Sequence, residues 1–419
     1  MNLRVRTLSA VAAIAIMSGC SAKFTPASLD SLDYISRAET LTKDGVTVTV
    51  AALTREETAL AFGSKLDKNL IQPVYVKIEN NSDGELLVIR HSLDPDYFSA
   101  YEASSLSQNY GNISNAKVEE LFRDSSLEQF VRPGSIEEGF VFTNLSLGIK
   151  QAQVKLLTDD DEIHFEFFLT VPGLKADWQR TDFANLYSED GFIDFDDPEE
   201  FRKTLEDFIC CTTRKDGTGS GDPINMVVVG DLDQLVAFIK AGWDETEIIS
   251  AGSSFRTAWS FVSGAEYKNS PISALYIFER PQDISLQKAR NTIHERNHLR
   301  LWLAPWRFQG RSVWIGGISR DIGVFWTTRT WNLTSHAIDS EIDEARMYIG
   351  EDLATAETLT SLAFVDGVGL TTKENPKQNL LGTPWWTDGR RIVLFLADEE
   401  TPLNELQVPD WSRRPGGSN

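Results

Sequence analysis

The stretch Asn297-His298-Leu299-Arg300-Leu301-Trp302-Leu303 decides how the second half of the chain is interpreted. Leucine occupies every second position from Leu299 to Leu303, and polar or aromatic residues fill the positions between. Successive side chains of a strand point to opposite faces, so this alternation predicts a strand with one leucine face. Gly310 then marks a turn into a second expected strand over residues 313–318.

The residues around this pair predict further strands and helices in no regular order. Strands are expected over residues 224–230, 275–278, 324–331 and 392–396, and helices over 231–240, 258–262 and from Asp339 to Leu353. Strands and helices that mix without a βα repeat are typical of an α+β domain, here with a mixed sheet.

Short alternating apolar runs fill the first half of the chain. They lie at residues 46–50, 74–78, 86–89, 139–142, 154–157 and 163–167. Such strands, divided by turn residues, predict an antiparallel β-sandwich, immunoglobulin-like in general shape. A chain of 419 residues is also long enough for two domains. We therefore divide it into a signal peptide (1–19), a polar tether (20–38), a β-sandwich domain (39–173), a linker with one helix (174–222) and an α+β domain (223–419).

The first twenty residues resemble the export signal of a bacterial lipoprotein. A basic start is followed by an apolar run at residues 8–17, too short to cross a bilayer core of roughly 30 Å. Met17-Ser18-Gly19-Cys20 is similar to a lipobox, which implies cleavage before Cys20 and attachment of lipid to its thiol. With Ser21 next, the resemblance implies an outer-membrane anchor facing the periplasm. An ordinary signal peptide with a chance cysteine is the alternative.

The chain is strongly acidic, with a formal net charge of −22. Loss of Arg4 and Arg6 with the signal would leave −24. A field this negative excludes nucleic acid as a partner and excludes attraction to anionic lipid through overall charge. No later run approaches 18 apolar residues, so no second membrane segment is predicted.

Cys210 and Cys211 are adjacent, and besides Cys20 they are the only cysteines in the chain. A lone adjacent pair cannot form a disulfide framework. We interpret them as two small residues at the end of a helix. A vicinal disulfide in an oxidising compartment is the alternative.

Several ordered motifs are spread over residues 223–353. They include Pro223-Ile224-Asn225, Tyr276-Ile277-Phe278-Glu279-Arg280, Asn297-His298-Leu299-Arg300-Leu301-Trp302, Val313-Trp314-Ile315-Gly316, Arg320-Asp321-Ile322-Gly323 and Ser335-His336-Ala337-Ile338-Asp339. Together they resemble the LssY-like C-terminal domain family. That family is named for a component associated with type I secretion, so the resemblance implies an envelope protein and supplies no mechanism.

His294-Glu295-Arg296-Asn297-His298 satisfies the H-E-x-x-H pattern, in which a helix brings two histidines to one zinc beside a glutamate base. Glu341 or Glu344 would supply a third ligand, and His298 with His336 is another pairing. The alternation that begins at His298 argues against this site. Four residues of strand span roughly 13 Å, whereas Zn–N bonds are near 2 Å. A metal-dependent hydrolase, with zinc as its cofactor, is therefore the alternative function.

Basic residues gather between Glu279 and Arg329, where nine of them accompany four acidic residues. We call these nine residues the basic island. Eight are arginines, whose forked guanidinium suits carboxylate or phosphate, and tryptophans lie among them. We expect an anion-binding site there, formed by Arg300, Trp302, Arg320 and His336. The alternative is that the arginines pair with acids of the same domain and the tryptophans fill its core.

These features together predict a lipid-anchored envelope protein with a β-sandwich spacer and an α+β domain. The α+β domain is expected to bind an anionic small molecule, a glycan or an envelope protein. A binding module is favoured over an enzyme, and no cofactor is expected for it.

Overall fold

A computed structural model describes residues 26–63, 65–107, 116–248, 269, 272–289, 295–326, 334–409 and 411. For Asp30, residues 324–326 and residues 334–337, only the backbone is described. Cys20, His294 and the helix expected at 258–262 lie outside this part of the chain. Within the described residues, no helix is both long enough and apolar enough to cross a membrane.

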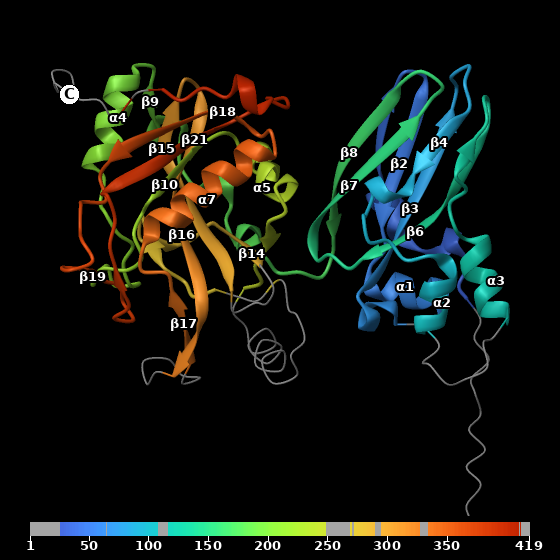
Figure 1. The fold of residues 1–419 in the computed structure, drawn as a ribbon, viewed down its shortest axis with the longest axis horizontal. Helices are drawn as coiled ribbons and strands as arrows, with labels where there is room; N and C mark the ends of the chain where they lie inside the picture. Colours follow the sequence, from blue (N-terminus) through green and yellow to red (C-terminus); the bar gives the residue numbers. More distant parts are fainter. Residues whose placement is uncertain are drawn as a thin grey trace, which may run out of the picture.

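Two four-stranded antiparallel sheets make up most of the N-terminal half (Figure 1). One has the order β1 (Glu39–Lys43), β2 (Val46–Ala52), β3 (Ile71–Asn80) and β6 (Ile136–Asn144). The other has the order β5 (Phe130–Val131), β4 (Leu86–Ile89), β7 (Gly148–Leu157) and β8 (Glu162–Val171). The alternating side chains of both sheets, such as Val48, Val76, Val154 and Phe165, fill one shared core. The expected antiparallel strands are confirmed.

Helices close one end of these sheets (Figure 1). They are α1 (Arg55–Phe62), η3 (Leu66–Asn69), α2 (Ala100–Ser107) and α3 (Ala116–Asp124). Thr54 and Glu57 form a capping box that starts α1. The segments η1 (Leu29–Ser31) and η2 (Asp33–Arg37) pack at this end, where the buried Tyr34 belongs to one cluster with Phe62 and Phe122. The packed body therefore begins near residue 29, ahead of the expected end of the tether at residue 38.

A mixed sheet organises the C-terminal half. In the described residues its main order is β11 (Asp244–Glu245), β14 (Ile284–Ala289), β15 (Arg296–Phe308), β16 (Arg311–Trp326), β10 (Met226–Val229), β21 (Arg390–Leu396) and β18 (Leu359–Asp366). Two further strands, β9 (Ile193–Phe195) and β17 (Thr334–Ile338), pair with β15 and β16. The β10–β21 and β15–β9 pairs are parallel and the others antiparallel, which confirms the mixed sheet.

Among the described residues, the helices that cover this sheet are α4 (Pro198–Asp207), α5 (Val236–Lys240) and α7 (Ile342–Thr355). On one face Leu299 and Leu301 pack with Ile349 of α7, which Figure 1 shows lying across the sheet. On the other face Phe201 of α4 packs with Val227. The leucine-faced strand and the helix ending near Leu353 were both predicted from sequence and are confirmed.

Several boundaries differ from expectation. The expected linker at 174–222 belongs to the C-terminal core, because β9 joins the sheet and Phe201 and Leu205 of α4 are fully buried. The expected strand at 275–278 is reduced to β12 (Tyr276–Ile277), which pairs with β13 (Arg280–Pro281) and bridges to Thr213. The strand expected to end at Ile318 continues as β16 to Trp326, because pairing with β15 and β17 sustains it.

Candidate functional site

The strand β15 turns its non-leucine residues into the protein rather than into solvent. Arg296, His298 and Arg300 alternate with the leucines and are each no more than 6% exposed. In the strand register His298 lies between Gln287 and Ser319, and Arg300 lies between Ser285 and Gly317. We call this surface the polar face and define it as Ser285, Gln287, Arg296, His298, Arg300, Ser319 and Asp321.

Ion pairs connect the polar face internally. Arg296 Nε lies 3.1 Å from Asp321 Oδ2, and Arg296 Nη1 donates to Gln287 Oε1. Arg300 Nη1 lies 3.4 Å from Asp222 Oδ2. Burial lowers the pKa of Arg300, while the nearby Asp222 and Asp321 act against that change.

His298 lies at the centre of the face. Its Nδ1 is 3.4 Å from Asp321 Oδ1, and within the described part of the chain this buried nitrogen makes no hydrogen bond. The face therefore brings a histidine and a carboxylate together beside two buried arginines.

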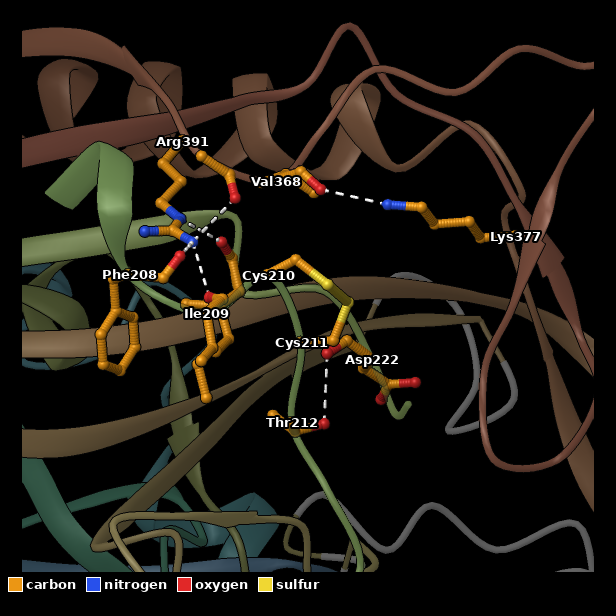
Figure 2. The surroundings of a disulfide bond; sticks show 11 residues. Phe208, Ile209, Cys210, Cys211, Thr212, Asp222, Val368, Lys377 and Arg391 are labelled. Carbon is orange, nitrogen blue, oxygen red and sulfur yellow. Dashed lines mark hydrogen bonds between the residues drawn. A yellow bond between two sulfur atoms is a disulfide. The ribbon is translucent and has the colours of Figure 1, made fainter. Parts of the chain in front are cut away.

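A strand-like segment places Asp222 against Arg300. Pro223 O passes over Gly317, where an added Cβ would lie only 2.6 Å from it, so the close approach requires glycine. Thr212 donates from both its backbone N and its Oγ1 to Asp222 O, at 3.0 and 3.1 Å (Figure 2). The position of Asp222 is thus fixed by the chain next to Cys211.

Cys210 and Cys211 are joined by a disulfide (Figure 2). This corrects the interpretation of them as two unlinked residues at a helix end. α4 already ends at Asp207, and three residues separate it from Cys211. Cys211 packs against Val368 and Trp385 in a small apolar cluster.

Arg391 anchors the chain just before the disulfide (Figure 2). Its guanidinium is fully buried and donates to five backbone carbonyls, those of Leu205, Phe208, Ile209, Ile224 and Gly367. Burial lowers the pKa of Arg391 to about 10. Three of these carbonyls, those of Leu205, Phe208 and Ile209, lie at or just after the end of α4, so Arg391 holds the chain that leads into the disulfide.

The strands that carry the polar face lie within a segment whose sequence matches a known protein family. Residues 202–390 match the family described as LssY C-terminus. They form an LssY-like C-terminal domain. The match extends beyond residues 223–353 on both sides and takes in most of α4. No curated protein matches the chain, and no solved structure does.

The basic island of the LssY-like domain is largely neutralised. Arg290 and Arg329 lie outside the described residues. Of the other seven, six have a carboxylate oxygen within 3.8 Å: Arg280, Lys288, Arg296, Arg300, Arg307 and Arg311. Trp302, Trp306 and Trp314 are buried. The alternative of internal pairing and core packing therefore describes most of the island.

The four expected anion-binding residues do not come together. Arg300 and Trp302 share a face, but Trp302 belongs to the apolar core and donates to Arg280 O at 3.3 Å. Arg320 lies on the opposite face, where it donates to Asn297 Oδ1 and sits over the Tyr348 ring. His336, expected to precede a helix, has its backbone in β17 and its side chain outside the described atoms.

The residues of the zinc alternative are placed as follows. His298 lies within β15, so the second half of the H-E-x-x-H pattern is extended rather than helical. Glu341 is exposed at the start of α7, and His294 lies outside the described residues. Among the residues that the structure describes, no group of three or more His, Cys, Asp or Glu side chains could hold a metal.

Sequence reasoning missed Asp222, Ser319 and Asp321 as neighbours of His298 and Arg300. Asp321 was noted only as part of a motif, and the other two carry no local signal. The turn at Gly310 was the available signal, since it makes β15 and β16 a hairpin.

Proposed function

We propose that the protein is a lipid-anchored envelope lipoprotein whose LssY-like domain binds an anionic ligand at the polar face. The observation that carries the proposal is the set of charged side chains buried around His298. Replacing a buried ion pair by apolar residues is often neutral or stabilising, so packing alone does not account for such a set. A binding role does account for it.

Arg300 is the proposed point of entry. Its guanidinium is buried, but Asp222 is only partly buried and Ser273, which accepts from Arg300 Nε and Nη2, is exposed. The Asp222 contact, at 3.4 Å, is longer than the usual charged hydrogen bond of about 2.8 Å. An incoming carboxylate or phosphate could therefore replace Asp222 on the guanidinium without unfolding the sheet.

His298 and Arg296 precede Arg300 along β15 and lie on the same face of the strand. The guanidinium groups supply the positive charge beside the proposed ligand, and the His298 ring offers a nitrogen for a hydrogen bond to it. This arrangement favours an anion over a neutral ligand.

The lipid anchor and the finer architecture belong to the same proposal. Met17-Ser18-Gly19-Cys20 supports acylation of Cys20, with the protein held in the outer membrane and facing the periplasm. Separate hydrophobic cores in the two halves support a two-domain protein. In it an immunoglobulin-like sandwich spaces the LssY-like domain from the membrane.

Calorimetric titration with inorganic phosphate and with succinate tests the binding site. Wild type should bind at least one probe, and Arg300→Met and His298→Asn should each weaken that binding by tenfold or more. The matched control is Arg320→Met, because Arg320 lies on the opposite face of the same sheet. Equal affinity in all four proteins would refute the polar face as the site.

Mass spectrometry of the mature N-terminus tests the anchor. We expect Cys20 to be the first residue and to carry lipid, and Cys20→Ser to leave the membrane fraction or remain unprocessed. A free thiol at Cys20, or an intact Met1, would contradict it.

A further inference from the structure

The helical end of the N-terminal half exposes several large apolar side chains. Ile35, Leu60, Leu70 and Tyr101 are each about half exposed or more. They lie on or next to η2, α1, η3 and α2, whose neighbouring residues share one buried cluster. We call these four residues the apolar end. Grouped apolar side chains on a surface mark an interaction site more often than scattered ones do.

The chain enters the folded body at the apolar end. Ala27 N donates to Leu60 O at 3.0 Å, and Leu29 and Leu32 pack against the same cluster. If Cys20 carries the proposed lipid, the seven residue-to-residue steps from Cys20 to Ala27 span at most about 25 Å. Leu60 is therefore held within that distance of the lipid headgroups.

The segments that carry the apolar end are close to neutral, unlike the whole chain. Across η2, residues 55–70 and α2 there are four basic and five acidic residues, a net charge of −1; they are Arg37, Arg55, Lys65 and Lys68 against Asp33, Glu56, Glu57, Asp67 and Glu102. The chain as a whole carries −22. An anionic membrane surface would repel most of the protein, but it would not strongly repel these segments.

We propose that the apolar end inserts into the headgroup region of the membrane that holds the anchor. Aliphatic side chains such as Leu60 would reach the acyl boundary, about 5–10 Å deep, and the Tyr101 hydroxyl would stay among the headgroups. The inference rests on the proposed lipid anchor. It adds an orientation, in which the helices face the lipid and the opposite end of β6 points away from it.

Spin labels on single introduced cysteines test this orientation. Cys20 is acylated in the proposed protein and Cys210–Cys211 is a disulfide, so a new cysteine is labelled selectively. Leu60→Cys and Ile136→Cys form a matched pair, since these residues are 53% and 56% exposed. Ile136 lies eight residues along β6 from Asn144, which pairs with Ile71, so it is about 26 Å from the apolar end.

The measurement uses the full lipidated protein in vesicles of phosphatidylethanolamine and phosphatidylglycerol. The measured quantity is the accessibility of each label to oxygen divided by its accessibility to a water-soluble nickel complex. This ratio should be raised for the label at residue 60. For the label at residue 136 it should equal the ratio of a label in water. If Cys20 is lipidated and both labels give the aqueous ratio, the inference is wrong and the anchor stands. If Cys20 carries no lipid and the protein stays in solution, the anchor and the inference fail together.

Discussion

Replacing Asp321 by asparagine should destabilise the LssY-like domain far more than breaking an exposed ion pair of the basic island. The side chains of Asp321 and Arg296 are 2% and 3% exposed, and 3.1 Å separates the paired atoms. Asparagine removes the negative charge and leaves the arginine buried. The charged group then keeps its desolvation penalty and loses its main compensation.

The expected loss follows from this burial. Removing one partner of a buried pair costs about 3–5 kcal/mol, and the remaining amide oxygen of asparagine places this variant near the lower value. With a urea dependence of about 2 kcal/mol per molar, the unfolding midpoint should fall by roughly 1.5 M. The matched control is Glu189→Gln, which breaks the exposed pair with Arg307 and should leave the midpoint nearly unchanged.

Urea unfolding followed by tryptophan fluorescence is the assay. Every tryptophan of the chain lies at or after Trp178, so the signal reports on the C-terminal half. The double variant Arg296→Met/Asp321→Leu should recover most of the lost stability and still fail to bind phosphate or succinate. If Asp321→Asn and Glu189→Gln shift the midpoint equally, the reasoning from burial is wrong.

Three further outcomes are expected. Burial raises the pKa of Glu57, but hydrogen bonds from Arg37 and Thr54 outweigh it and hold the pKa below its ordinary 4.5. Its contribution to stability is therefore present above about pH 4.5 and lost as the pH falls through the lower folded value. Acid unfolding followed by circular dichroism should show less of this loss in Glu57→Gln. Arg391→Met should lower the stability of the LssY-like domain by about 3–5 kcal/mol, because buried carbonyls lose a charged donor, and thermal unfolding measures it. Iodoacetamide should leave Cys210 and Cys211 unmodified until a dithiol reduces them, as intact mass would show; alkylation without reductant would contradict the disulfide.

Many of the strands could be predicted from the sequence, because a strand with one buried face has an apolar residue at every second position. The alternation of Val46, Val48 and Val50 and that of Leu299, Leu301 and Leu303 each mark a strand with one buried face, and the structure confirms both strands. The expected linker shows where this reasoning stops. Phe201 and Leu205 of α4 are buried, but a short amphipathic helix does not reveal which core it joins.

The candidate site could be predicted only in part, because the pairing of β15 with β16 changes register within the hairpin. Near the turn Phe308 lies opposite Arg311, and continuing that register would place His298 opposite Asp321. The register shifts by two residues between Leu303 and Arg307, so His298 lies opposite Ser319. Pro305, which has no amide hydrogen to donate, lies within the shifted stretch.

The sequence by itself determined the strands, their leucine face and the match to the LssY C-terminus family, because these depend on local period and ordered motifs. Only the tertiary structure decided what the other face of β15 meets. Asp222 is 78 residues before Arg300 in the chain, and Asp321 is 25 residues after Arg296. Charges so far apart pair only when the sheet brings them together, and burial in that sheet leaves each charge dependent on the partner that it meets there.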